Sequence, residues 1–82
     1  MRTRRARPTT AVPINGAALR RIRIDRGIEV AELARRIQVS RPYISKLELG
    51  HSKRVSPTVH KALLQVLQLT DRDALRADTA AA

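Results

Sequence analysis

The sequence contains no cysteine, tryptophan or phenylalanine, and Tyr43 is its only aromatic residue. Because cysteine is absent, the chain can form neither a disulfide framework nor a thiolate zinc site, and its stability must come from a packed core. That core must be helical and aliphatic. No apolar run approaches the length that a membrane-spanning helix needs.

Acidic residues are also scarce: 17 Lys and Arg stand against 7 Asp and Glu, a formal net charge of +10. A polyanionic partner is therefore the leading interpretation, and nucleic acid fits it best. A membrane-surface role is less favoured, because the basic residues are spread over several segments. The arginine-rich start resembles that of a signal peptide, but the following "PTTAVPING" is too short and too polar, so we expect a cytoplasmic protein.

Composition divides the chain into three parts. Residues 1–14 hold two prolines and four arginines without an apolar period, and we expect them to form a disordered basic arm. Residues 15–76 are periodic, and their length of about 60 residues is near the lower limit for one independently folding domain. Residues 77–82 are expected to be a flexible tail.

Capping residues and apolar spacing predict an all-α domain of five short helices. The first four are expected to begin at Asn15, Glu29, Ser40 and Ser56, and the first and third to end at Gly27 and Gly50. The segment "HSKR" after Gly50 is expected to be an exposed loop, and "DRDALRA", capped by Thr70, a short fifth helix.

The third helix, in "VSRPYISKLELG", has a proline near its start. With Ser40 as N-cap, Pro42 falls in the first turn, where its missing N–H would have no intrahelical acceptor. Ile44 and Leu47 then face the core, and at about 100° per residue the opposite side is centred on Pro42, Ser45, Lys46 and Leu49, with Arg41 and Tyr43 at its edges.

The segment "ELARRIQVSRPYISKLELG" resembles the helix-turn-helix of the Xre/Cro/phage-repressor family, and the resemblance spans about residues 16–76. It implies a compact, five-helix, lambda-repressor-like domain whose third helix enters the major groove of DNA. The residues that carry the resemblance are Leu33, Ala34, Val39, Ile44, Leu47, Glu48 and Gly50.

Several positions depart from the family pattern. The second helix usually begins with Thr or Ser followed by Gln, whose side chain bonds a phosphate, whereas this chain has Glu29 and Val30. The turn usually contains Gly where this chain has Gln38, and a left-handed residue other than glycine costs on the order of 1 kcal/mol. His60 stands where the family has an apolar residue.

The resemblance implies four base-reading residues, Arg41, Pro42, Ser45 and Lys46, and the helical geometry places all four on the outward side or at its edge. Arg41 and Lys46 suit guanine, and the Pro42 ring suits a thymine methyl group. Residues predicted to contact phosphates, or to lie in the arm, are Arg2, Arg4, Arg5, Arg7, Arg35, Tyr43, Lys53 and Arg54. The resemblance also implies a structural ion pair between Arg23 and Glu48.

Each assignment has a plainer alternative. Arg41 and Lys46 could form only a solvated helix face, and Tyr43 could be a partly buried edge aromatic. The "MRTRRAR" arm could be an unspecific basic tail or an arm that enters the minor groove. His51 and His60 lack a supporting acidic cluster, so we expect no metal, cofactor or enzymatic activity.

These residues together predict a sequence-specific, double-stranded DNA-binding regulator of the repressor or Cro type, in a bacterial nucleoid or a phage-infected cell. A homodimer, at least on DNA, is implied by the family resemblance and by two-fold operators, with only Leu69, Leu75 and their neighbours as candidates for a C-terminal contact. Two alternatives stay open: an antitoxin that also binds a protein partner, and a basic RNA-binding protein, which the lack of stacking aromatics disfavours.

Overall fold

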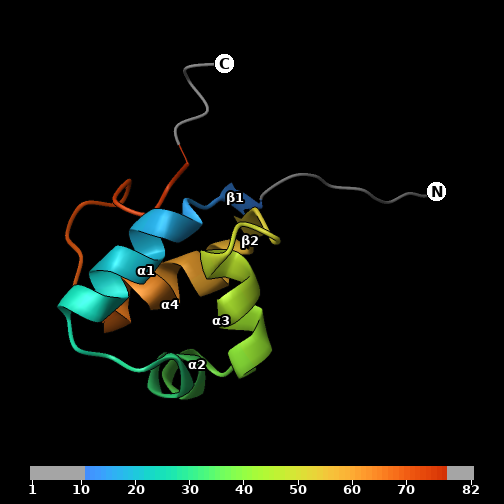
Figure 1. Cartoon of the computed structure of the whole chain (residues 1–82). Helices are drawn as coiled ribbons and strands as arrows, with labels where there is room; N and C mark the ends of the chain where they lie inside the picture. The colour runs from blue at the N-terminus through green and yellow to red at the C-terminus, as the bar shows by residue number, and fades with distance from the viewer. Residues whose placement is uncertain (1–10, 78–82) are drawn as a thin grey trace.

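The computed structural model describes residues 11–77 and contains four helices and a small two-stranded sheet within that range (Figure 1). In Figure 1, α2 lies at the lower end, α3 rises from it along one side, and α1 and α4 complete the bundle. The elements in chain order are β1 (Val12–Pro13), α1 (Gly16–Asp25), α2 (Val30–Ile37), α3 (Arg41–Glu48), β2 (Arg54–Val55) and α4 (Pro57–Val66).

Short polar side chains begin three of the helices, as the sequence predicts. The Asn15 side chain accepts a hydrogen bond from the Ala18 N–H at 3.0 Å, and Ser40 Oγ accepts one from Tyr43 at 3.2 Å. Ser56 caps α4 in the same way, and Pro57 directly after it needs no N–H partner. In each case the cap satisfies a backbone donor of the first turn.

Aliphatic side chains from all four helices meet in one core. Helix α2 packs on both α3 and α4, and α1 packs on α3, so the second and third helices form a helix-turn-helix on a helical support. The completely buried large side chains are Leu19, Leu33, Ile44, Leu47, Leu63, Leu67 and Leu75. None of the helices within residues 11–77 is long and apolar enough to cross a membrane.

The turn between α2 and α3 depends on a left-handed residue. Gln38 has φ 63° and ψ 46°, the conformation that glycine adopts without penalty. Its backbone N–H bonds back to α2, and Val39 packs against the core directly after it. The turn expected from the family pattern is therefore made with a glutamine.

The predicted boundary of the N-terminal arm is wrong at its last residues. Val12 pairs with Val55 and Pro13 with Arg54 in an antiparallel ladder, and Ile14 is only 5% exposed. The "HSKR" loop consequently ends in a strand, because Arg54 belongs to β2. Backbone pairing and the burial of Ile14 attach residues 12–14 to the domain; the first ten residues of the predicted arm lie outside the described range.

The predicted fifth helix is also absent from the described residues. Residues 72–75 form a turn, and Arg76 makes an isolated antiparallel bridge with Ile14. The carbonyl of Leu75 accepts the Asn15 N–H at 2.7 Å, and Ala77 donates its N–H to Pro13 at 3.2 Å. Within the segment, Ala74 and Arg76 donate their N–H groups to the carbonyls of Asp71 and Asp73, both at 3.1 Å, as in turns. The groups of Leu75 and Ala77 bond to the start of the domain, so the segment is a turn tied to residues 13–15 and not a helix. The overall class, a compact helical domain that contains a helix-turn-helix, is confirmed.

Candidate nucleic-acid interface

The outer face of α3 carries the four residues that the sequence assigns to base reading. Arg41, Pro42, Ser45 and Lys46 are all exposed. Ile44 and Leu47, on the opposite side of the helix, are completely buried. The helix is therefore held by its apolar side, and it presents two cations, a hydroxyl and a rigid ring to whatever approaches.

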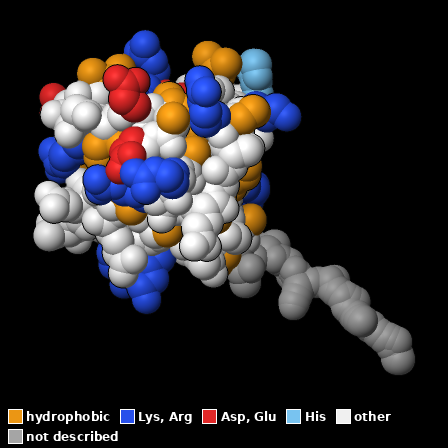
Figure 2. Space-filling model, turned by 90° about the horizontal axis from the view of Figure 1, so that it is seen from below, with side chains coloured by type: hydrophobic (Ala, Val, Ile, Leu, Met, Phe, Trp, Pro, Cys, Tyr) orange, Lys and Arg blue, Asp and Glu red, His pale blue; other side chains and the backbone are white. Residues whose placement is uncertain are grey.

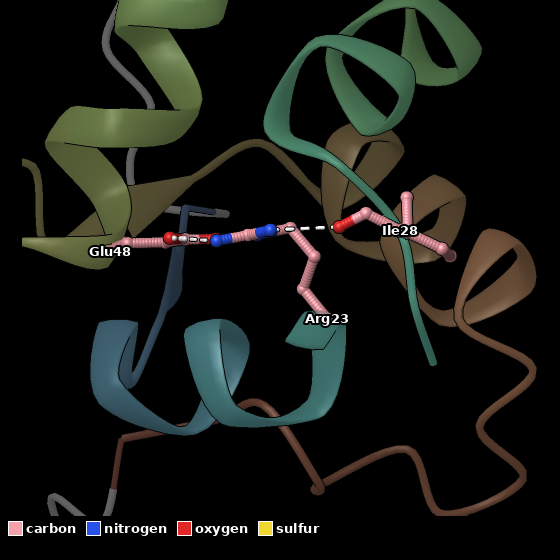
Figure 3. A network of polar contacts seen from close by, with 3 residues as sticks. All are labelled: Arg23, Ile28 and Glu48. Atoms are coloured by element: carbon pink, nitrogen blue, oxygen red, sulfur yellow. Dashed lines mark hydrogen bonds and ion pairs between the residues drawn. The ribbon is translucent and has the colours of Figure 1, made fainter. Parts of the chain in front are cut away.

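A nearly buried ion pair fixes the C-terminal end of α3 to α1. Arg23 donates from Nε to Glu48 Oε2 at 2.6 Å and from Nη2 to Glu48 Oε1 at 3.1 Å, a bidentate arrangement (Figure 3). A third bond, from Arg23 Nη1 to the Ile28 carbonyl at 2.8 Å, reaches the segment before α2. The paired Glu48 carboxylate raises the pKa of Arg23. One guanidinium thus joins α1, the segment before α2 and the end of α3.

The residues predicted to contact phosphates lie at several places around this face. Lys53 and Arg54 are exposed in and beside β2. Arg35 forms an ion pair with Glu32, which also accepts a hydrogen bond from Arg36 Nε at 2.6 Å. These bonds lower the pKa of the Glu32 carboxyl, the Arg36 bond most strongly. The Arg35 side chain is 71% exposed and bonds Glu32 through Nη2, so a phosphate would meet a guanidinium that a carboxylate already partly neutralises.

Tyr43 has a mixed environment. Its side chain is partly buried and packs against the core, and burial raises the pKa of its hydroxyl. The ring is therefore an edge aromatic of the domain, which is one of the two interpretations that the sequence allows. A hydroxyl at the edge of α3 remains compatible with a phosphate contact as well. Arg2, Arg4, Arg5 and Arg7 lie outside the described residues.

Seen from below, the molecule shows Lys and Arg side chains at several places around this end and fewer acidic side chains (Figure 2). The basic groups surround the end where Figure 1 places α2 and the start of α3. A surface of this sign attracts a polyanion over distances set by the ionic strength.

The two histidines lie in different elements. His51 is exposed in the loop after α3, whereas His60 is partly buried in α4. Among residues 11–77, no group of three or more His, Cys, Asp and Glu side chains could hold a metal ion. The partly buried position of His60 therefore bears on the stability of the domain and on its pH dependence.

Two structural contacts were missed by reasoning from the sequence. Arg26 donates from Nε to the Leu67 carbonyl at 2.8 Å, which links the end of α1 to the end of α4. Gly16 lies so close to α3 that a Cβ there would be 1.9 Å from the Leu47 carbonyl oxygen. Both contacts join residues far apart in the chain, so no local sequence pattern predicts them.

Two short helices joined by a tight turn, with the second held across a helical support, define the helix-turn-helix class. Residues 16–78 match a protein family described as "Helix-turn-helix domain", and the chain belongs to that family. This confirms the resemblance carried by residues 32–50. A comparison with curated proteins gives no significant match.

The solved structures that are similar to this chain include two regulators. The clp gene regulator ClgR from Corynebacterium glutamicum is 37% identical, with a TM-score of 0.66 over 72% of this chain and 62% of the ClgR chain. SinR, a master regulator for biofilm formation solved in complex with DNA, is 22% identical, with a TM-score of 0.66 over 72% of this chain and 95% of the SinR chain. The SinR likeness concerns the fold alone.

Proposed function

We propose that this chain is a sequence-specific, double-stranded DNA-binding transcriptional regulator of the repressor or Cro type. One observation carries the proposal: Arg41, Pro42, Ser45 and Lys46 are exposed together on a helix whose other side is completely buried. Membership of the helix-turn-helix family and the net charge of +10 support it. The similar ClgR is described as a gene regulator. On this proposal the protein acts at a bacterial nucleoid or in a phage-infected cell.

The proposed mechanism follows from the size and chemistry of α3. Its eight residues make a helix roughly 12 Å long, which the major groove of B-DNA, about 12 Å wide, can accept. Arg41, at the first position, can donate two hydrogen bonds to guanine O6 and N7, and Lys46 can reach a guanine one turn further on. Lys53, Arg54 and the N-terminal arginines would contact phosphates and set the register. Occupying an operator in this way would exclude polymerase.

We further propose that the protein binds DNA as a homodimer, with half-sites about one helical turn apart. Leu75 cannot provide the contact suggested by the sequence, because it is completely buried in the core. Leu69, which is partly buried, remains available. The proposal therefore rests on the two-fold symmetry of operators and not on an interface within the described residues.

Selection of bound duplexes from a random DNA pool tests the proposal. We expect a recurring sequence that binds at least about 10³-fold more tightly than scrambled duplex. Competition with double-stranded and single-stranded RNA of equal length provides the control for charge. Equal affinity for all duplexes, or preferential displacement by RNA, would refute a regulator that reads bases and would favour a general or RNA-binding role.

A further inference from the structure

A shallow hollow lies between the start of α2 and the start of α3. Four side chains line it: Val30, Arg41, Pro42 and Ser45. Arg41, Pro42 and Ser45 belong to the proposed base-reading face, whereas Val30 comes from the neighbouring helix and had no assigned role. The hollow therefore extends the proposed DNA face from α3 onto α2.

The two aliphatic walls of the hollow are rigid before any ligand binds. Val30 is the first residue of α2, and its β-branched side chain, partly buried against the core, has one strongly preferred rotamer in a helix. Pro42 lies in the first turn of α3, and its ring fixes the backbone there. These two side chains would give up little conformational freedom when a ligand binds, which favours binding of a small apolar group.

The chemistry of the hollow selects one group on duplex DNA. The Val30 side chain has no hydrogen-bond donor for a phosphate oxygen or for a base acceptor. In the major groove, thymine alone presents an apolar group, its C5-methyl, beside the donors and acceptors of the four base pairs. Arg41, on the rim of the same hollow, offers two donors to a guanine at a neighbouring position.

We propose that Val30 and Pro42 together seat the C5-methyl group of a thymine adjacent to the guanine that Arg41 reads. This inference rests on the proposed function and deepens it: Val30 becomes a specificity-determining residue. At the position where the resemblance implies a Gln bonded to a phosphate, Val30 would make an apolar contact with the thymine methyl group. The preferred operator then contains thymine beside guanine in each half-site.

Uracil substitution tests the proposal, because uracil lacks only the C5-methyl group of thymine. In the selected operator each thymine is replaced in turn, and the dissociation constant is measured. We expect uracil at one position per half-site to raise the dissociation constant about fourfold, the effect of exposing about one buried methyl group. Uracil at every other position should change the dissociation constant by less than about twofold.

Variants of Val30 assign the effect to this side chain. Val30→Thr keeps the shape but places a hydroxyl in the hollow, and Val30→Ala removes both methyl groups; we expect the fourfold thymine preference to disappear in both. Ile24→Ala, which removes an exposed apolar side chain from α1, should retain it. Thermal unfolding of each variant verifies that it is folded.

Three results would overturn the proposal, and they differ in what else they affect. If uracil is tolerated at every position, or if both Val30 variants keep the wild-type preference, the contact of Val30 and Pro42 with a thymine methyl group is refuted. The proposed operator binding is not affected by either result. If the wild-type protein does not distinguish the selected duplex from a scrambled one, the proposed function is refuted, and the proposed thymine contact is refuted with it.

Discussion

Gly16 shows how closely α1 approaches α3. It is buried directly after the N-cap Asn15, and a Cβ there would lie 1.9 Å from the Leu47 carbonyl oxygen and 3.0 Å from that of Glu48. These neighbours are backbone atoms, which cannot rotate away as a flexible side chain could. The position therefore requires glycine for space rather than for its backbone conformation.

Gly16→Ala should consequently lower the free energy of unfolding by about 1–3 kcal/mol, the usual penalty of inserting an atom into a packed region. Alanine would otherwise favour a helix, so the sign of the change is informative. Denaturant unfolding measures it, with Ala17→Ser, an exposed neighbour on the same helix, as the control. A variant as stable as the wild-type protein would show that α1 and α3 lie further apart.

His60 should make stability depend on pH. Its Nε2 is buried without a hydrogen-bond partner among residues 11–77, and burial, together with the charges of Arg76 and Arg72, lowers its pKa below the ordinary 6.5. Below about pH 6.5 the unfolded chain therefore binds more protons than the folded one. The stability present at neutral pH is lost as the pH falls through this window.

Melting temperatures measured between about pH 7.5 and pH 5 should therefore fall for the wild-type protein and fall less for His60→Gln. His51→Gln, which removes an exposed histidine from the loop, should keep the wild-type slope. An identical pH dependence in the wild-type protein and His60→Gln would mean that the buried imidazole carries no proton-linked stability.

The packing of α1 against the end of α3 depends on the ion pair of Arg23 and Glu48, whose side chains are 11% and 6% exposed. Removing one member would leave the other charge nearly buried and unpaired, which can cost about 3–5 kcal/mol. A domain of this size has a total stability of only several kcal/mol. Arg23→Ala should therefore lower the melting temperature markedly, whereas Arg20→Ala, an exposed position on the same helix, should scarcely change it.

A double-mutant cycle separates the pair from the rest of the fold. We expect Arg23→Ala and Glu48→Ala to show a coupling energy above about 1 kcal/mol, as contacting residues in one network do. Coupling indistinguishable from zero would contradict the contact between α1 and α3, and with it the side of α3 that is free to meet DNA.

Local signals in the sequence predicted the helices because three of the four helix starts have a capping side chain, whereas Glu29 before α2 makes no side-chain cap bond. Asn15, Ser40 and Ser56 accept the expected first-turn hydrogen bonds. The strands were missed because each has only two residues, too few to show an alternating pattern, and their partners lie some forty positions away in the chain. The same applies to residues 75–77, whose backbone partners are at residues 13–15.

The candidate site was partly predictable, because its α3 residues follow the local period of one helix. The burial of Ile44 and Leu47 determines, through the helical period, that Arg41, Ser45 and Lys46 face outward. The hollow beside them could not be predicted, because Val30 reaches it only through the angle between α2 and α3. Spacing within one helix is encoded locally, whereas the approach of two helices depends on the packed core.

The net charge of the chain sets a contribution to binding that does not depend on base sequence. Deleting residues 2–7 removes four arginines. On the proposed role, the deletion should reduce the slope of log affinity against log salt concentration by up to about 0.9 for each phosphate that the arm neutralises. Deleting residues 78–82, which contain no Lys or Arg, is the matched truncation. An unchanged salt slope after the first deletion would leave the arm without a role on DNA.

Base reading by the outer face of α3 can be separated from attraction by charge with two double variants. Arg41→Ala with Lys46→Ala removes two charges from α3, and Arg20→Ala with Arg21→Ala removes two exposed charges from α1. The decisive quantity is the affinity ratio between the selected operator and a scrambled duplex. We predict that the α3 variant lowers this ratio at least about tenfold, since each base contact contributes about 1–3 kcal/mol, while the α1 variant retains it; an equal ratio in both variants would contradict sequence reading by α3.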